Sequence, residues 1–509
     1  MTSLTATPLA ENAVTRDVAV IDIGSNSVRL VHYRLEGRAV WPVYNEKVMA
    51  GLGRGIRDTG RLHDEGYRIA LRALKRFQRL LRAKSITDVY PVATAAVRYA
   101  QDGQDFVDEV RALTGFEIRV LTGEEEGGLS AQGLLSGIPA AHGMMGDLGG
   151  ASLELTDLVS GESGLSRSVP LGPQSILTEQ DEGLGKAKVR IKTVLKEVHG
   201  LKGRGGTFYA VGGAWRALTH LAFAQTGYPL HVVHQFALND AQTRTLTRFA
   251  MSQSPASLRG IPNLSQRRMA NLPYAALLLR QIMKHGAFDQ VVFSANGLRE
   301  GVLMQQIPPV IREQDPLIAG ADALARPIVP SIQFGTALLS WMQPFLDVIP
   351  RAFSEHDYRR YVGAACRMVD LGARFHPDHR GQLVRDTVLY APLAGCCHAG
   401  RVFIAAILQT RYGETRGETD AILALLDRDQ RATAEAVGLV MRLAAKLSGR
   451  SPELLERFEV DIDSARIRLD VAESVHDLYV ERALSNLDQI ASRVGRAAQV
   501  RYLGADAAE

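Results

Sequence analysis

The sequence predicts an α/β fold of two duplicated lobes, followed by an all-helical C-terminal domain. The chain has 509 residues, which exceeds the roughly 250–300 at which a single core stops growing. Segments 18–43 and 144–169 share one pattern, in which a short apolar run, a glycine-containing turn and two more runs follow each other. Five prolines between 308 and 330 precede a region with apolar residues at helical spacing. We therefore expect a flexible leader over 1–17, lobes over 18–140 and 141–310, and a helical domain over 320–509.

In the first lobe, the β-branched run Val18–Ile21 is typical of a strand buried on both faces. The chain turns over residues 22–27, and alternating apolar and polar residues over 28–35 predict a second strand. A turn at Glu36-Gly37 then leads to a third strand. Apolar residues at helical spacing over 67–81 predict a helix with basic residues on its other faces. Two more strands are expected over 89–94 and 116–121.

The second lobe repeats this plan from residue 144 onward. A turn over 147–152 separates two strands, as residues 22–27 do in the first lobe. Residues 186–196 predict a helix whose basic residues flank an apolar stripe. Its positive charge would attract an anionic chain, and the alternative is a charged face that is only exposed to solvent. Further strands are expected over 208–211 and 291–294, and a helix of the C-terminal domain over 434–447.

Composition places the chain among ordinary globular proteins. Hydrophobic residues make up 46% and charged residues 22%, and the formal net charge is +4, so the charge does not require a nucleic-acid partner. The N-terminus lacks a basic start followed by an apolar core, and no run approaches about 20 apolar residues. We therefore expect a cytoplasmic protein that binds an anionic substrate and has no nucleic-acid or membrane partner.

The two glycine turns are candidate phosphate-binding loops. Glycine lets an anion approach the backbone N–H groups closely, and hydroxyl or amide side chains add donors. Asp22 and Asp147 end the preceding strands, where a carboxylate can hold Mg²⁺ directly or through water. The alternative is that both aspartates only cap turns. The candidate phosphate-binding residues are Gly24, Ser25, Asn26, Gly149, Gly150, Ser152 and the later pair Gly212 and Gly213.

Five motifs carry a resemblance to a known family. They are Ile21-Asp22-Ile23-Gly24-Ser25-Asn26-Ser27, Ala93-Thr94-Ala95-Ala96-Val97-Arg98, Thr122-Gly123-Glu124-Glu125-Glu126, Gly146-Asp147-Leu148-Gly149-Gly150-Ala151-Ser152-Leu153-Glu154-Leu155 and Gly297-Leu298-Arg299-Glu300-Gly301. In this order they resemble the exopolyphosphatase/guanosine pentaphosphate phosphohydrolase family. That family is part of the superfamily of actin, the heat-shock ATPases and the sugar kinases, and this implies two RNase H-like, actin-type lobes.

The resemblance implies roles for particular residues. Glu125 would be the base that activates water, although acids are also favoured at a helix N-terminus. Asp147 and Glu154, with Asp22, would bind Mg²⁺ or Mn²⁺. Arg98 would bind phosphate, unless it is a solvated helix residue. The sequence departs from the family pattern at two places. Ala151 stands where a third glycine is usual, and residues 268–270 lack the usual aspartate. Both differences bear on substrate preference.

The C-terminal domain is weakly similar to a helical HD-type domain. Where a metal-binding His-Asp pair would lie, the sequence has Val369-Asp370, and His376, His379 and His398 do not form a metal-binding spacing. We expect a degenerate HD-type domain that lines the substrate path and contributes to a homodimer.

The predicted function is exopolyphosphatase activity, the release of terminal phosphate from inorganic polyphosphate. Guanosine pentaphosphate (pppGpp) is the alternative substrate. A phosphotransferase of the same superfamily and a nucleotide-sensing module without turnover are the other hypotheses.

Overall fold

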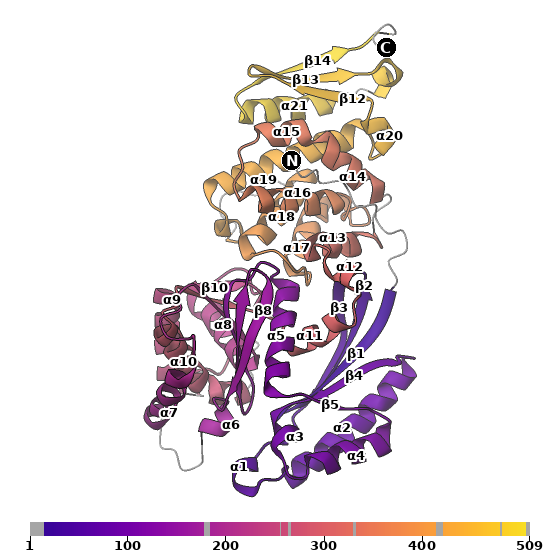
Figure 1. Cartoon of the computed structure of the whole chain (residues 1–509). Helices are drawn as coiled ribbons and strands as arrows, with labels where there is room; N and C mark the ends of the chain where they lie inside the picture. Colours follow the sequence, from indigo (N-terminus) through magenta and orange to yellow (C-terminus); the bar gives the residue numbers. More distant parts are fainter. Residues whose placement is uncertain are drawn as a thin grey trace. The chain divides into compact units, whose positions relative to one another are not determined.

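The computed structural model describes residues 15–177, 184–254, 256–262, 266–328, 332–413, 421–478 and 481–504. The chain divides into two compact units, which consist mainly of residues 14–313 and 314–509 and are described separately (Figure 1). Of the expected leader, residues 1–14 lie outside the described residues. Thr15 to Asp17 form the start of the first strand instead, because they continue its pairing with the second strand, with Thr15 opposite Glu36.

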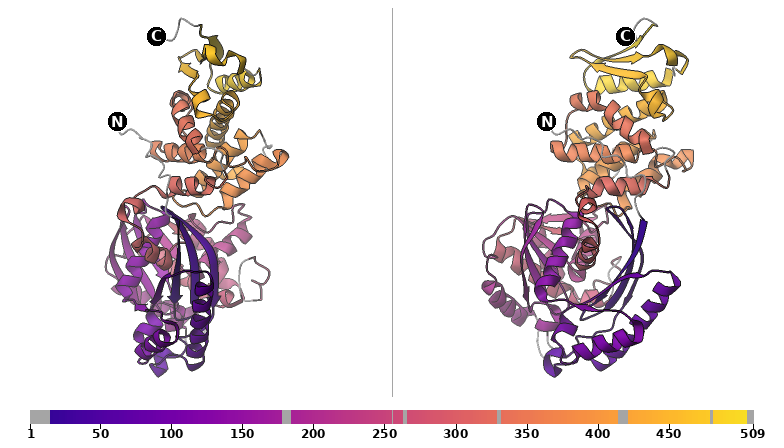
Figure 2. Two further views of the ribbon diagram at one scale, coloured as in Figure 1. Left: turned by 90° about the vertical axis from the view of Figure 1, so that its right-hand side faces the viewer. Right: turned by 45° about the vertical axis from the view of Figure 1, so that its right-hand side comes forward.

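The first lobe contains a five-stranded sheet in the order β3-β2-β1-β4-β5. Strands β1 to β3 are antiparallel neighbours, and β4 and β5 continue the sheet in parallel. Both faces of β1 are buried, Val18 and Val20 on one and Ala19 and Ile21 on the other. Helices α2 and α4 cover the second of these faces (Figure 2). The elements are β1 (Thr15–Ile23), β2 (Val28–Glu36), β3 (Ala39–Val48), α1 (Ile56–Thr59), α2 (Asp64–Ala83), β4 (Asp88–Ala93), α3 (Ala95–Tyr99), α4 (Gly103–Thr114) and β5 (Arg119–Val120).

The second lobe repeats the strand order of the first. Its sheet reads β8-β7-β6-β9-β11-β10, so that one edge strand is added to the pattern of the first sheet. Strands β6 to β8 are antiparallel, and β9 and β11 continue in parallel. This repetition confirms the predicted duplication. The elements are α5 (Gly123–Gly137), β6 (Gly143–Leu148), β7 (Leu153–Val159), β8 (Glu162–Val169), α6 (Pro173–Ile176), α7 (Leu184–Glu197), β9 (Thr207–Val211), α8 (Gly213–Thr226), β10 (Phe236–Asn239), α9 (Asp240–Ser252), α10 (Gln266–Gly286), β11 (Gln290–Phe293), α11 (Leu298–Gln305) and α12 (Pro309–Arg312).

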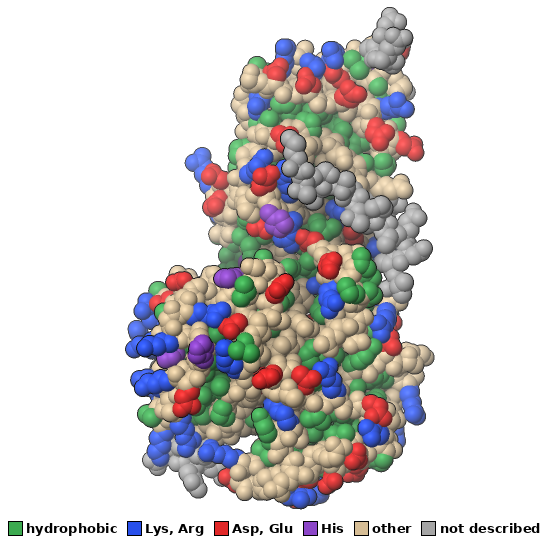
Figure 3. All heavy atoms as spheres, in the orientation of Figure 1, with side chains coloured by type: hydrophobic (Ala, Val, Ile, Leu, Met, Phe, Trp, Pro, Cys, Tyr) green, Lys and Arg blue, Asp and Glu red, His purple; other side chains and the backbone are tan. Residues whose placement is uncertain are grey.

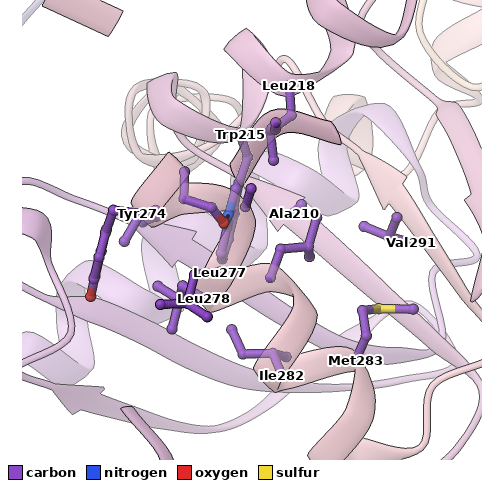
Figure 4. Close-up of a cluster of buried hydrophobic side chains, with 14 of the residues drawn as sticks. Ala210, Trp215, Leu218, Tyr274, Leu277, Leu278, Ile282, Met283 and Val291 are labelled. Atoms are coloured by element: carbon purple, nitrogen blue, oxygen red, sulfur yellow. Dashed lines mark hydrogen bonds between the residues drawn. The ribbon is translucent and has the colours of Figure 1, made fainter. Parts of the chain in front are cut away.

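The core of the second lobe lies between this sheet and helices α7, α8 and α10. Trp215 of α8 and Tyr274 of α10 are among its largest buried side chains (Figure 4). Their polar atoms are satisfied, since Trp215 Nε1 donates to Ala275 O at 3.1 Å and the Tyr274 hydroxyl donates to Leu171 O at 2.7 Å. The core therefore fixes the sheet that carries the second glycine loop.

Helix α5 packs against β7, β8 and α11 (Figure 1). The contact with α11 depends on glycine. A Cβ added to Gly133 would lie 1.9 Å from Gly297 O, and a Cβ added to Gly301 would lie 1.8 Å from Leu129 O. The two backbones can approach only because these positions have no side chain. This packing fixes the N-terminal turn of α5, which carries the three consecutive glutamates.

The C-terminal unit is helical up to residue 455 and ends in a three-stranded sheet. The prediction of helices is confirmed for most of the unit. It is wrong for the last part, which contains a three-stranded sheet in the order β12-β13-β14. The reason is alternation: Ile467, Leu469 and Val471 are buried at every second position of β13. The elements are α13 (Pro316–Ala325), α14 (Ile332–Trp341), α15 (Gln343–Val348), α16 (Glu355–Arg367), η1 (Pro377–His379), α17 (Arg380–Tyr390), α18 (His398–Arg411), η2 (Leu423–Leu425), α19 (Arg428–Leu447), α20 (Pro452–Leu455), β12 (Phe458–Ile462), β13 (Arg466–Val471), η3 (Glu473–Leu478), α21 (Glu481–Arg493) and β14 (Ala497–Tyr502).

None of the helices in the described ranges combines the length and the apolar character that crossing a membrane would require.

Candidate active site

Two equivalent loops follow the first strand of each lobe. In the β1–β2 loop, Gly24 N donates to Ser27 O at 3.0 Å, and in the β6–β7 loop, Gly149 N donates to Ser152 O at 3.0 Å. The same backbone bond at equivalent positions makes the two loops copies of one structure. The sequence pattern of residues 22–27 and 147–152 thus corresponds to one repeated turn.

The two loops also face each other. A Cβ added to Gly150 would lie 3.3 Å from the Cβ of Ser25, so the loops come within van der Waals distance. Each loop accepts matching bonds from a later segment of its lobe. Gly53 N donates to Ser25 O at 2.8 Å, and Gln174 N donates to Gly150 O at 2.9 Å. The candidate phosphate-binding residues of both lobes are therefore brought together.

The side chain of Glu125 caps the N-terminus of its own helix. It is the N3 residue of a capping box, in which its carboxylate accepts from Thr122 N at 2.8 Å. The same carboxylate pairs with Arg119 at 2.6 Å, and its side chain is 40% exposed. The hydrogen bond from the Thr122 backbone and the one from Arg119 hold the pKa of Glu125 below its usual value. Glu125 is therefore a stably ionised capping residue at the surface.

Glu126, the next residue, points to the interior. Its side chain is 10% exposed and pairs with Arg98 at 3.1 Å. Burial raises the pKa of Glu126 to about 7, the Arg98 guanidinium opposes this, and the charges of Asp147 and Asp22 add to it. A carboxylate with a pKa near neutrality can accept and release a proton at physiological pH.

Asp147 and Glu154 lie opposite each other on β6 and β7. Ser130 of α5 donates to Asp147 at 2.5 Å, and Ser168 of β8 donates to Glu154 at 2.9 Å. Burial raises the pKa of Asp147, with Asp22 adding to the effect. Burial also raises the pKa of Glu154, and the charges of Glu126 and Asp147 contribute. Asp147 and Glu154 thus repel each other's charge in a buried environment.

We refer to Glu126, Asp147 and Glu154 as the acidic cluster. Among the described residues, no group of three or more His, Cys, Asp or Glu has the geometry of a complete metal site. Mg²⁺ with phosphate ligands, however, commonly uses one or two protein carboxylates and keeps several waters. Asp147 and Glu154 fit this pattern, because a cation beside them would relieve their mutual repulsion.

Asp22 is paired with a residue that was not among the predicted site residues. Arg299 of α11 donates from Nη1 to Asp22 Oδ2 at 2.9 Å. The helix start is fixed by Glu300, which accepts from Gly297 N at 2.9 Å and from the Tyr33 hydroxyl at 2.7 Å. Asp22 is therefore paired with an arginine, as Glu126 is, whereas Asp147 and Glu154 accept hydrogen bonds from serines.

The Arg98 guanidinium uses only part of its hydrogen-bonding capacity. Its Nη1 donates to Leu121 O at 2.6 Å and to Glu126. Its Nε and Nη2 are buried and donate to no acceptor in the described part of the chain. A guanidinium with two uncommitted nitrogens next to Glu126 can bind a phosphate oxygen.

Gly212 and Gly213 join β9 to α8. Gly212 has φ 118°, and an added Cβ would lie 2.6 Å from Leu148 O. Only glycine allows this backbone to pass so close to the end of β6. Gly213 is the first residue of α8, so a free helix N-terminus lies beside the strand that ends in the second loop.

Sequence reasoning missed Glu126, Arg299 and Ser130 as site residues. Glu126 and Ser130 are four residues apart and so share one face of α5 with Gly133. Glu126, Ser130 and Gly133 are all buried, so α5 turns a small and polar face to the interior. Arg299 lies in a motif that carried the family resemblance.

The basic helix α7 is amphipathic as predicted. Ala187, Ile191 and Leu195 are buried, and its lysines are exposed. Lys and Arg side chains gather on this edge of the lobe, over α7, α9 and α10 (Figure 3). That α7 attracts an anionic chain remains a prediction.

In the C-terminal unit, Val369 and Asp370 are buried and lie just after α16. Asp370 has arginines as neighbours, 3.6 Å from Arg411 and 3.8 Å from Arg450. His376 and His379 contact each other, with ring centroids 5.8 Å apart, and His398 begins α18. The three histidines and Asp370 do not form a metal cluster within the described ranges.

The fold and the site together define a class: a pair of duplicated RNase H-like lobes with two facing glycine loops, as in the actin-like ATPase superfamily. Within it, residues 18–309 match the Ppx/GppA phosphatase family, and residues 317–500 match the family described as "Exopolyphosphatase, C-terminal". The first match covers more than half of the chain. The protein therefore belongs to the Ppx/GppA phosphatase family, a family of hydrolases.

Two relatives are similar to this chain at low sequence identity. Retrograde regulation protein 2 of Saccharomyces cerevisiae is 24% identical over 464 residues, which cover 82% of this chain and 77% of that protein. Exopolyphosphatase 1 of Mycobacterium tuberculosis is 28% identical over 177 residues, which cover 34% of this chain and 52% of that protein. The second alignment thus spans about half of the relative.

Solved structures support the fold of the two lobes. A Ppx/GppA family member from Aquifex aeolicus is 23% identical with a TM-score of 0.51, and the match covers 58% of this chain and 98% of that one. An exopolyphosphatase from Cytophaga hutchinsonii is 21% identical with a TM-score of 0.52, covering 57% and 98%. At these identities the likeness concerns the fold alone.

Proposed function

We propose that this protein hydrolyses the terminal phosphoanhydride bond of inorganic polyphosphate and releases phosphate. The observation that carries the proposal is Glu126, a buried carboxylate with a pKa of about 7. It pairs with Arg98 and feels the charges of Asp22 and Asp147, which precede the two glycine loops. Membership in a phosphatase family and the partial alignment with an exopolyphosphatase favour this substrate.

Phosphoryl transfer needs a positioned water, a base and neutralisation of the phosphate oxygens. Glu126, rather than Glu125, accepts the proton of the attacking water, because its carboxylate is buried in the acidic cluster, whereas that of Glu125 is committed to Thr122 and Arg119. The water oxygen bonds to the terminal phosphorus, and the bridging P–O bond breaks. The shortened chain leaves with the bridging oxygen.

The chain's own donors hold the terminal phosphate. The loops around Ser25 and Gly150 approach it from both lobes, and the free N–H groups of Arg98 bind its oxygens. Asp147 and Glu154 would hold Mg²⁺ or Mn²⁺, and the bound cation supplies neutralisation of the phosphate charge. Ser130 and Ser168 keep these two carboxylates in place.

The test is phosphate release from long-chain polyphosphate and from guanosine pentaphosphate, side by side, with Mg²⁺ and with excess chelator. We expect release from polyphosphate that requires the cation. Release from guanosine pentaphosphate alone would replace the substrate but keep the reaction. Release from neither would contradict the proposed hydrolysis and favour a nucleotide-sensing module.

A further inference from the structure

In the C-terminal unit, two arginines lie beside one buried carboxylate, and a third is hydrogen-bonded to the end of α18. Arg411 is the last residue of α18, Arg442 lies on α19, and Arg450 follows that helix. We refer to these three residues as the arginine cluster. Asp370, whose side chain is 3% exposed, lies next to two of them.

The contacts with Asp370 are too long for hydrogen bonds. Arg411 Nη2 lies 3.6 Å and Arg450 Nη1 lies 3.8 Å from Asp370 Oδ1. N–H···O hydrogen bonds usually span 2.7–3.2 Å, so these pairs attract by charge alone. Asp370 therefore leaves the hydrogen-bonding capacity of both guanidinium groups unused.

Two guanidinium nitrogens of the cluster have no acceptor. Nε of Arg411 and Nε of Arg442 are buried, and neither donates a hydrogen bond within the described residues. Arg442 uses Nη2 to donate to Thr410 O, at the end of α18. A buried N–H without an acceptor is costly, and each such group gains from an anion within reach.

The charges of the cluster are also unbalanced. Burial holds the pKa of Arg411 below its usual value, and Arg450 and Arg380 add to this effect. Burial and the charge of Arg411 do the same to Arg442. The Arg411 side chain is 13% exposed and that of Arg450 is 42% exposed, so the cluster extends from the interior to the surface. An anion could thus reach it from solvent.

We propose that Arg411, Arg442 and Arg450 form a binding site for the phosphoryl group of a small anion. A phosphoryl group offers several acceptor oxygens and up to two charges, and the planar guanidinium binds such groups through two N–H donors at once. The same chemistry is present in the end of a polyphosphate chain and in a nucleoside diphosphate. The site lies in the C-terminal unit and does not depend on the proposed hydrolysis.

The test is hydrogen exchange of the full-length protein with two probes. One is imidodiphosphate, a polyphosphate-like anion with a P–N–P bridge that resists hydrolysis, and the other is GDP. In the wild-type protein we expect slower exchange in peptides that cover residues 405–413 and 440–452. Peptides that cover residues 122–130 report the proposed active site separately, so failure of one site is distinguishable from failure of the other.

Arg450→Gln is the main variant, since this side chain is exposed and its loss should leave the fold intact. Losing a charged hydrogen-bond partner should weaken protection of the two C-terminal peptides at least about tenfold in probe concentration. Arg428→Gln is the matched control, because this exposed arginine lies at the other end of α19. It removes the same charge and should leave protection unchanged.

Arg442→Gln is a second variant, and a thermal melt shows first that it is folded. Equal protection by both probes means that the phosphoryl group alone is recognised, and protection by GDP only means that a nucleotide is the ligand. No protection by either probe at millimolar concentration would overturn the proposal. Unchanged protection in Arg450→Gln and in folded Arg442→Gln would overturn it as well.

Discussion

The acidic cluster of the N-terminal unit and the arginine cluster of the C-terminal unit have opposite charge imbalances. In the first, burial raises the pKa of Glu126, Asp147 and Glu154, and Arg98 is the paired cation. In the second, burial lowers the pKa of Arg411 and Arg442, and Asp370 is the neighbouring acid. One cluster gains from a cation and the other from an anion.

The comparison shows that a buried charged residue is informative only together with its neighbours. Asp22, for example, is paired with Arg299 at 2.9 Å. Such pairs are satisfied by the chain itself. Unmatched charge costs folding energy, and this makes it a marker for ligand binding or catalysis.

The largest expected effect separates Glu126 from Glu125. Glu126→Gln should lower kcat for phosphate release about 10²–10⁴-fold, because the base is lost while the shape is kept. Glu125→Gln removes the same charge one residue away and should keep kcat within about threefold, since this carboxylate only caps α5. If Glu125→Gln loses turnover and Glu126→Gln keeps it, the base is Glu125.

The second prediction concerns the cation. Asp147→Asn should raise the Mg²⁺ concentration for half-maximal activity by more than about tenfold, and Ser130→Ala should raise it by up to that amount, because Ser130 orients Asp147. Magnesium titrations of activity measure both effects. Ser136→Ala is the control, since this hydroxyl on the same helix donates to Gly133 O. Equal Mg²⁺ requirements in all variants would remove Asp147 from the metal site.

A smaller effect is expected at Arg98. Arg98→Lys keeps the charge near Glu126 but loses the fork of N–H donors, so KM for polyphosphate should rise about tenfold. Steady-state kinetics separates KM from kcat. Arg119→Lys is the comparison, because Arg119 pairs with the surface carboxylate of Glu125. A rise in KM for Arg119→Lys that equals the rise for Arg98→Lys would contradict the assigned phosphate contact.

The smallest effect is on stability. Glu125→Ala breaks the capping box of α5 and should lower the free energy of unfolding by about 0.5–1 kcal/mol. Chemical denaturation of the full-length protein measures this change in the N-terminal unit. A loss of several kcal/mol would mean that Glu125 does more than cap the helix.

Local sequence patterns were sufficient to predict the duplicated lobes and their glycine loops. Apolar runs such as Val18–Ile21 fix strands through local patterning, and the turn residues 22–27 and 147–152 repeat along the chain. These signals are local, so they can be read without knowing the fold. Local signals also predicted the helices of the C-terminal unit, although the alternation in β13 was overlooked.

Which acids lie together depends on the tertiary structure. Glu125 and Glu126 are neighbours in a run of three glutamates, and the chain gives both the same local chemistry. Successive residues of a helix point in directions about 100° apart, so one carboxylate meets Thr122 and Arg119 and the other meets Arg98. The same holds for Asp370, which lies 3.6 Å from Arg411, and for Arg442, which donates to Thr410 O. These residues are distant in sequence and meet because α18 packs against α16 and α19. Burial and charge balance arise from such long-range contacts, and they set the pKa values on which the chemistry depends.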